Sequence, residues 1–255
     1  MPAYKKRQRG LFDPNSSEPF KISRSKIDLF VDCPRCFYLD LRYGIPRPSF
    51  PAFTLNNAVD TLLKKEFDVH REAQSVHPLC KEHGIDAVPY QHEELEAWRD
   101  ALRRGIQYHH KPTNFLVRGG IDDVWIDKEG KLIIVDYKAT SKIEKPNLDG
   151  FWQQAYKRQA EVYQWLFRQN GFDVHPTAYF VYVNGKADLD VFDAKLEFDM
   201  DIIPYEGSDD WIEGTLIEAR GTLERNAIPE IGENCEYCTY REAAGKKLQE
   251  IVKGK

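Results

Sequence analysis

The sequence predicts an α/β fold in which helices flank a mixed central sheet. Two strands are expected at 115–127 and 131–140, joined by Lys128-Glu129-Gly130, a short turn with glycine where a positive φ is needed. A long helix is expected at about 149–169, and a further strand follows at 177–183. Strands and helices that alternate in this way are typical of a sheet covered by helices.

The other elements follow from apolar periodicity and end signals. Ser23 or Ser25 can cap a first helix, and Gly171 ends the helix at 149–169. Apolar residues recur near a spacing of 3.6 from Phe53 to about Arg71, which predicts an amphipathic helix. The remaining expected elements are helices at 93–108 and 209–226, one or two strands within 188–203, and a tail from Ile228.

Length and composition set limits on the architecture. A chain of 255 residues with 42% apolar content can bury a sizeable core, so we expect one domain over 21–255 after a flexible lead-in at 1–20. The sequence contains no apolar run near the roughly 20 residues of a membrane span and no apolar signal segment, so we expect a cytoplasmic protein without membrane contact. A net charge of -5 argues against a purely electrostatic nucleic-acid binder.

The predicted hairpin brings three charged side chains together. If the hairpin is centred on Glu129, positions that sum to 258 face each other, so Asp122 lies opposite Asp136 and Gly120 lies opposite Lys138. The period of two puts Lys138 on the face of Asp136, beside open space at Gly120, and turns Tyr137 away.

These charges stand at the end of a strand that reads as buried on both faces, Leu132 to Val135. Facing carboxylates repel when they are partly desolvated, and a hard cation relieves that repulsion. Mg²⁺ suits the arrangement because it takes one or two carboxylates together with waters and phosphate oxygens. Spacing alone leaves the alternative open that Asp136 and Lys138 are an ordinary surface ion pair and that Asp122 is solvated.

The segments Gly119-Gly120-Ile121-Asp122 and Ile134-Val135-Asp136-Tyr137-Lys138 resemble motifs II and III of the PD-(D/E)xK nuclease superfamily. More narrowly, they are similar to the RecB-type branch, which includes the exonucleases of CRISPR adaptation. The resemblance implies a restriction-endonuclease-like core. It also implies that Asp122, Asp136 and the carbonyl of Tyr137 bind Mg²⁺ or Mn²⁺, and that Lys138 positions or activates the attacking water.

Two further segments extend the resemblance. Gln159 and Tyr163 match the QxxxY motif of the helix after the hairpin, and their i, i+4 spacing places both on one helix face. Asp60 stands where this branch often has a metal-binding His, and Asp binds Mg²⁺ or Mn²⁺ readily. Taken alone, these residues also fit a surface amide, a core-edge aromatic and a solvated helix charge.

Four of the five cysteines form two CxxC pairs, Cys33 with Cys36 and Cys235 with Cys238. Two such pairs in one intracellular chain predict a metal site, and four thiolates suit zinc or an iron–sulfur cluster. The fifth, Cys80, is expected to be a small buried hydrophobe.

Many RecB-type nucleases hold a [4Fe-4S] cluster with one Cys in a CP context near the N-terminus and three near the C-terminus. In this chain the third C-terminal cysteine of that pattern would fall near Ala244, which is not a cysteine, and Cys36 is an additional thiol near the N-terminus. We expect a [4Fe-4S] cluster, with Zn²⁺ or no metal as alternatives. The cysteines would join about 21–50 and 228–245 into a subdomain with a structural role.

The expected function is that of a metal-dependent DNA nuclease, an exonuclease acting on DNA that includes single-stranded ends. The resemblance implies protein partners in a DNA repair, phage or CRISPR-adaptation complex. Trp152 or Tyr156 could stack a base. The alternative is a DNA-binding or adaptor protein with the nuclease fold but no catalysis, structured by the Cys-ligated metal.

Overall fold

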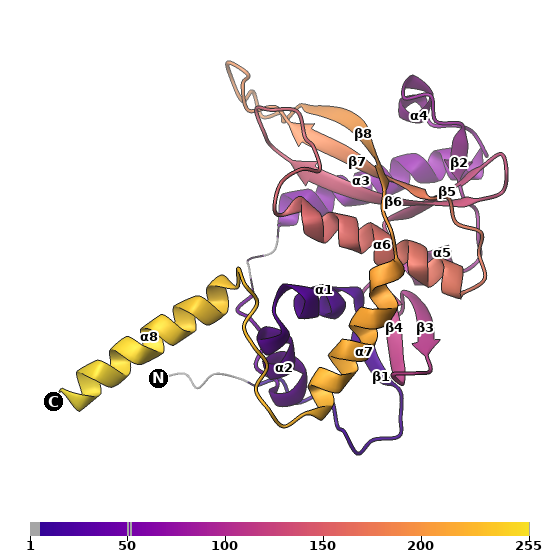
Figure 1. Cartoon of the computed structure of the whole chain (residues 1–255). Coiled ribbons are helices and arrows are strands. Elements are labelled where there is room, and N and C mark those ends of the chain that lie inside the picture. The colour runs from indigo at the N-terminus through magenta and orange to yellow at the C-terminus, as the bar shows by residue number, and fades with distance from the viewer. Residues whose placement is uncertain (1–5, 50, 52, 255) are drawn as a thin grey trace. The chain divides into compact units, whose positions relative to one another are not determined.

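The computed structural model describes residues 6–49, 51 and 53–254 (Figure 1). Its contacts divide the chain into two units. The terminal unit combines residues 1–50, 109–117 and 210–255, and the sheet unit combines 51–108 and 118–209. The described elements are β1 (Phe20–Ser23), α1 (Arg24–Asp32), α2 (Pro34–Tyr43), α3 (Thr54–Glu72), α4 (Pro78–Glu82), β2 (Ala87–Pro89), α5 (Leu95–Arg99), β3 (Ile106–His110), β4 (Phe115–Gly119), β5 (Asp123–Asp127), β6 (Leu132–Thr140), α6 (Gln153–Gln169), β7 (Thr177–Gly185), β8 (Phe198–Glu206), α7 (Asp210–Glu224) and α8 (Glu236–Lys253).

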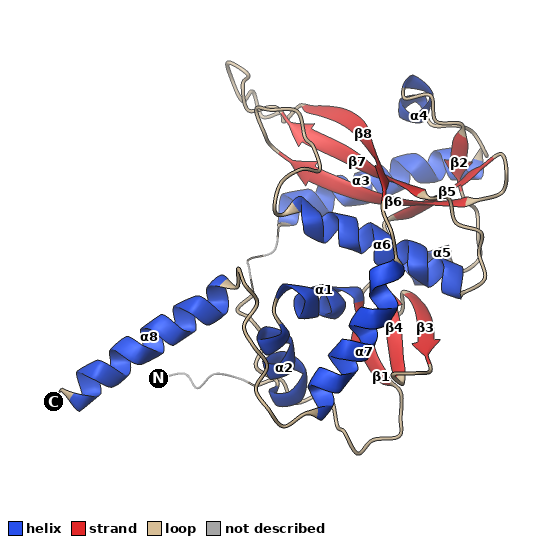
Figure 2. Cartoon of the chain, in the orientation of Figure 1, coloured by secondary structure: helices blue, strands red, loops and turns tan. Residues whose placement is uncertain are grey.

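A five-stranded sheet, in the order β2-β5-β6-β7-β8, forms the centre of the sheet unit (Figure 2). Strands β6 and β7 run parallel, and the other neighbours run antiparallel. The apolar sequence of β6 accounts for its central position, because both faces of this strand are covered. The predicted mixed sheet flanked by helices is therefore confirmed.

The two faces of β6 have different chemistry. Val135 and Tyr137 belong to a buried apolar cluster together with Leu63 and Phe67 of α3. Because side chains alternate along a strand, Asp136 and Lys138 point to the opposite face, where α6 packs against β6. Over the three residues Asp136, Tyr137 and Lys138, the strand therefore presents an aromatic side chain to the core on one face and a charged pair on the other.

The strand predicted at 115–127 is interrupted. Strand β4 ends at Gly119 and belongs to a second sheet, ordered β1-β4-β3, whereas β5 begins at Asp123. The expectation of open space at Gly120 is wrong, because a Cβ there would lie 2.4 Å from the Cα of Ala101. The glycine instead lets the two backbone segments pack closely, and the predicted pairing of Gly120 with Lys138 does not form.

The helix predicted at 93–108 is wrong in its second half. Helix α5 ends at Arg99, and Ile106 begins a strand. The Asp100 carboxylate accepts the backbone N–H of Arg103 at 3.0 Å, which stabilises a turn in place of a helix. Helix α8 was not predicted at all, because Cys238 is its single buried residue and it therefore carries little apolar periodicity.

The terminal unit buries apolar residues of α1, α2 and α7. Residues 1–5 of the predicted lead-in lie outside the described residues. Within the rest of the lead-in, Phe12 is buried and the Arg7 guanidinium donates to the Asp40 carboxylate at 3.0 Å. The predicted flexibility of 1–20 and the single domain over 21–255 stay predictions. Among the described helices, none combines the length and the apolar character of a membrane span.

A buried ionic cluster lies behind the hairpin of β5 and β6. The Asp123 carboxylate is fully buried and accepts hydrogen bonds from Arg71, from Arg99 at 3.1 Å and from the Tyr137 hydroxyl at 2.7 Å. Both guanidinium groups also bind Asp68. The cluster therefore links α3, α5 and the hairpin.

Replacing the central carboxylate, Asp123→Ala, should destabilise the protein by about 3–5 kcal/mol, because it removes the one fully buried carboxylate that Arg71 and Arg99 share and leaves them only the half-exposed Asp68 among the described partners of both. Urea unfolding followed by circular dichroism measures the change. Glu129→Ala, at an exposed turn position, is the control and should stay within about 0.5 kcal/mol. Equal stability of the two variants would contradict a structural role for the cluster.

Candidate active site and cysteine cluster

A cavity of about 350 Å³, here called the carboxylate cleft, lies in the sheet unit between α3, the hairpin and α6. Larger hollows occur elsewhere, but this one is lined by four of the seven residues predicted for the active site; Asp136, Gln159 and Tyr163 are not among its lining residues. Its walls are formed by Asn56, Asn57, Val59, Asp60, Leu63, Asp122, Tyr137, Lys138, Ala139 and Tyr156.

Asp122 enters the cleft from the residue just before β5. Its Oδ2 accepts the backbone N–H of Tyr137 at 3.0 Å, and its carbonyl accepts the Nε of Arg99 at 3.2 Å. The hairpin pairs Asp123 with Val135, whose positions sum to 258 as predicted. The carboxylate of Asp122 is thus fixed to the neighbouring strand by the backbone, and its Oδ1 lies 3.4 Å from the Lys64 ammonium.

Asp136 and Lys138 form a buried ion pair at the end of β6. The Lys138 ammonium also lies 4.3 Å from the centre of the Tyr156 ring and donates to the Gln159 amide at 3.4 Å. Burial would lower the pKa of Lys138, but the negative charges of Asp136 and Asp122 outweigh it and raise the pKa. The lysine is therefore held as a cation beside the two carboxylates.

The predicted pair on α6 reaches the same place. Gln159 contacts Lys138 through its oxygen, and its Nε2 donates to the Tyr163 hydroxyl at 3.2 Å. Tyr163 is buried against Gly119, where a Cβ would lie 2.5 Å from the ring. The structure thus joins Lys138, Gln159 and Tyr163 in one chain of contacts.

Asp60, on α3, lines the cleft but is bound to a residue that we did not predict. The Lys64 ammonium lies 2.9 Å from the Asp60 carboxylate and 3.4 Å from that of Asp122. Burial would lower the pKa of Lys64, but the charges of Asp122 and Asp60 raise it. The i, i+4 spacing of Asp60 and Lys64 was the signal that sequence reasoning missed.

Asp123 was missed as well, although it adjoins Asp122 in the sequence. It does not line the cleft; its bond to the Tyr137 hydroxyl holds that side chain on the far side of β6. Burial raises the pKa of Tyr137 well above its ordinary value, so its hydroxyl remains a donor to Asp123. Asp123 therefore supports the hairpin, and Asp122 is the aspartate that the cleft exposes.

The donors of the carboxylate cleft fit a hard divalent ion. In the described part of the chain, the four cysteines are the sole group of three or more metal-binding side chains whose ligand atoms all lie within 4.8 Å of one another. Asp60, Asp122 and Asp136 therefore do not converge as a closed cage. Mg²⁺ does not need one, since it binds through one or two carboxylates and keeps waters and phosphate oxygens as its other ligands.

The four predicted cysteines come together in the terminal unit, and all four are buried. The Sγ of Cys36 lies 3.5 Å from those of Cys235 and Cys238, and the Sγ of Cys33 lies 3.8 Å from that of Cys238. The cluster joins the N- and C-terminal segments of the chain, as predicted. Cys80 is buried in the sheet unit, also as predicted.

The cysteine thiols differ in acidity. Burial raises the pKa of the Cys36 thiol to about 11. Burial would also raise the pKa of Cys33, but the backbone N–H groups of Gly232 and Cys36 outweigh it and lower the pKa to about 7. Four buried sulfurs with donors directed at them are arranged as ligands for a soft metal.

The family model of the PD-(D/E)XK nuclease superfamily matches residues 21–243. The crystal structure of SSO0001 is similar, with a TM-score of 0.44, 17% identity, and coverage of 89% of this chain and 87% of that chain. No curated protein matches. With a family model that spans most of its length, the chain belongs to the PD-(D/E)XK nuclease superfamily.

Proposed function

We propose that this protein is a divalent-metal-dependent DNA exonuclease whose active site is the carboxylate cleft. Membership of the superfamily implies metal-dependent nuclease activity. The observation that carries the proposal is that Asp122 and Lys138 line one cavity and that Asp136 is paired with Lys138 at its edge.

In this proposal Asp122 and Asp136 hold Mg²⁺ or Mn²⁺, with the Tyr137 carbonyl and Asp60 as further ligands. The ion supplies Lewis acidity and a more acidic bound water. Lys138, held between Asp136, Gln159 and the Tyr156 ring, orients the water or a phosphate oxygen. Tyr163 fixes Gln159, so it acts on the reaction through Lys138.

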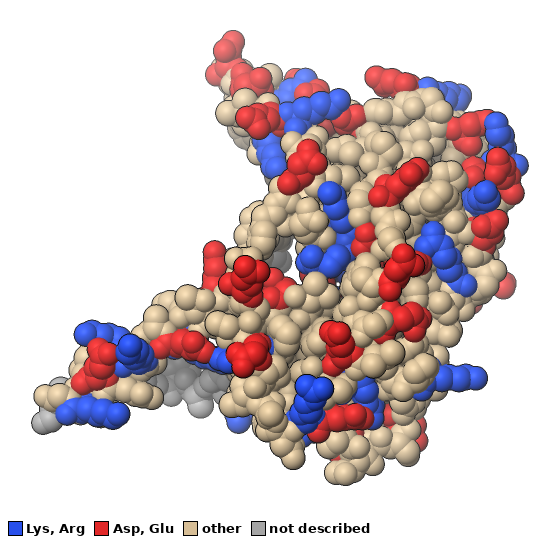
Figure 3. Space-filling view, viewed as in Figure 1, with Lys and Arg blue, Asp and Glu red and all other residues tan. Residues whose placement is uncertain are grey.

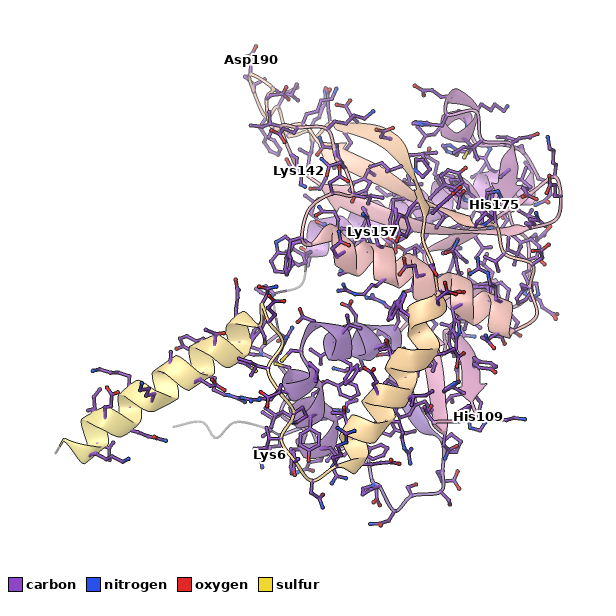
Figure 4. All side chains as sticks on the ribbon, viewed as in Figure 1. Lys6, His109, Lys142, Lys157, His175 and Asp190 are labelled. Atoms are coloured by element: carbon purple, nitrogen blue, oxygen red, sulfur yellow. The ribbon has the colours of Figure 1, made fainter. Side chains whose placement is uncertain are left out.

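DNA as the substrate is supported by the nuclease superfamily to which the chain belongs. Acidic and basic side chains are interspersed over the face drawn in Figure 3, so binding would rely on local contacts and not on overall charge. Lys142, on the loop after β6, and Lys157, on α6, are labelled in Figure 4 and could contact phosphates.

A preference for single-stranded ends is supported by exposed aromatic rings. Phe151 and Trp152 are 61% and 71% exposed just before α6, and Tyr156 lines the cleft one turn later. Exposed rings beside a cleft suit stacking with unpaired bases. A role in repair, phage biology or CRISPR adaptation, and any protein partner there, rests on the sequence resemblance alone.

Asp136→Ala should lower the rate of DNA hydrolysis by at least about 10³-fold, because it removes a proposed metal ligand and the partner of Lys138. The assay follows end-labelled single- and double-stranded DNA with Mn²⁺. Asp199→Ala removes an exposed carboxylate of β8 and should keep full activity. Equal degradation by wild type and Asp136→Ala would remove the proposed site. DNA binding without hydrolysis by wild type in either metal would favour the non-catalytic alternative.

Gln159→Ala should lower kcat by about 10-fold and change KM little, since it loosens Lys138 without removing a charge. The matched control is Gln154→Ala, an exposed amide on the same helix. Steady-state kinetics on single-stranded DNA separate the two parameters. A pure KM effect would instead make Gln159 a substrate-binding residue.

Lys64→Met should tighten Mn²⁺ binding several-fold, because the ammonium competes with the ion for Asp60 and Asp122. Titration calorimetry with Mn²⁺ in the absence of DNA measures the affinity. Lys65→Met, the exposed neighbour on α3, should leave it unchanged. Weaker binding in Lys64→Met would mean that the lysine organises the carboxylates.

A further inference from the structure

We infer that Cys33, Cys36, Cys235 and Cys238 hold one tetrahedral Zn²⁺ ion and not the [4Fe-4S] cluster that the sequence resemblance implies. The inference concerns the terminal unit alone. It does not depend on the nuclease function proposed for the sheet unit.

Sulfur spacing is the first argument. Three of the Sγ–Sγ separations are 3.5, 3.5 and 3.8 Å, and all four sulfurs lie within 4.8 Å of one another. Four thiolates around one zinc, each bonded at about 2.3 Å, form a tetrahedron with edges of roughly 3.8 Å. The three separations of 3.5, 3.5 and 3.8 Å are close to that edge length.

The same spacing does not fit a cluster. In a [4Fe-4S] centre each cysteine binds a different iron, and the irons and sulfides stand between the thiolates. The thiolates are then separated by an iron–iron distance and by the outward spread of the iron–sulfur bonds. Sulfurs held within 4.8 Å leave no room for that core.

Each CxxC turn supplies two of the four thiols. Cys33 caps the N-terminus of α2, and Cys235 caps that of α8, so both pairs lie at the positive ends of helices. The N–H groups of Cys36 and Gly232 donate to the Cys33 sulfur at 3.5 and 3.3 Å. This two-plus-two arrangement is that of a structural zinc site.

Nearby guanidinium groups accommodate the negative charge that four thiolates would bring to the site. Four thiolates and one Zn²⁺ leave two negative charges, and the cysteines release their protons to solvent as they bind. Arg47 donates to the Cys235 sulfur at 3.2 Å, and Arg241 lies 3.9 Å from the Cys238 sulfur. These two guanidinium groups offset part of the remaining charge, and Arg47 also pairs with the Asp32 carboxylate.

The test is metal analysis of the full chain, purified without oxygen from cells supplied with iron and cysteine. We expect about one zinc per chain, no acid-labile sulfide and no broad absorption near 400 nm. Exchange for Co²⁺ should give the visible bands of a tetrahedral thiolate complex. Iron with acid-labile sulfide would overturn the inference, and so would one iron per chain without sulfide.

Variants test which residues bind the ion. Cys235→Ser with Cys238→Ser should lower the zinc content from about one to near zero per chain, whereas Cys80→Ser, at the buried thiol of the sheet unit, should keep it. Zinc retained by the double variant would contradict the assignment. If the double variant does not fold, the Co²⁺ spectrum of the wild-type chain still decides the case. Nuclease activity is no part of this readout, so loss of the proposed function would leave the result unaffected.

Discussion

The burial of Asp136 and Lys138 at the end of β6 is the constraint on which the sheet unit depends. Two charges taken out of water cost several kcal/mol each unless each has a partner. Here each charge is partly offset by the other, and Tyr156, Gln159 and the backbone-anchored Asp122 surround the lysine with complementary groups. The apolar core on the other face of β6 holds the strand in place, so the charged pair cannot move outward to solvent.

The buried ionic cluster around Asp123 holds the hairpin in place on the opposite face of β6 from Asp136 and Lys138. Asp123 neutralises Arg71 and Arg99 in the interior and binds the hydroxyl of Tyr137, whose N–H holds Asp122. Two consecutive aspartates therefore have opposite environments. Asp123 is paired with two arginines in the interior, and Asp122 lines the cleft. The difference in burial between Asp122 and Asp123 therefore identifies Asp122 as the candidate metal ligand, independently of the family comparison.

Much of this arrangement follows from sequence pattern. The register about Glu129, the apolar β6 and the Gln159–Tyr163 spacing place the hairpin and α6 correctly, because alternation and i, i+4 rules act over short distances. The break at Gly119-Gly120 could not be read in this way, since it depends on the approach of Ala101 from a distant segment. Nor could Lys64 and Arg71 be assigned their partners, because the pairing of α3 with the hairpin is a tertiary contact. The roles of the site residues themselves remain proposals.

A change in the length of the short loop between β5 and β6 can affect the whole site. Side chains on β6 alternate strictly, so the loss or gain of a single codon at Lys128-Glu129-Gly130 that shifted β6 by one place against its neighbours would exchange its two surfaces. Tyr137 would then project toward the cleft, and Asp136 would be driven among aromatic rings. An insertion that shifted the register in this way would abolish chemistry and folding together, whereas one absorbed within the exposed turn would leave both faces of β6 in place.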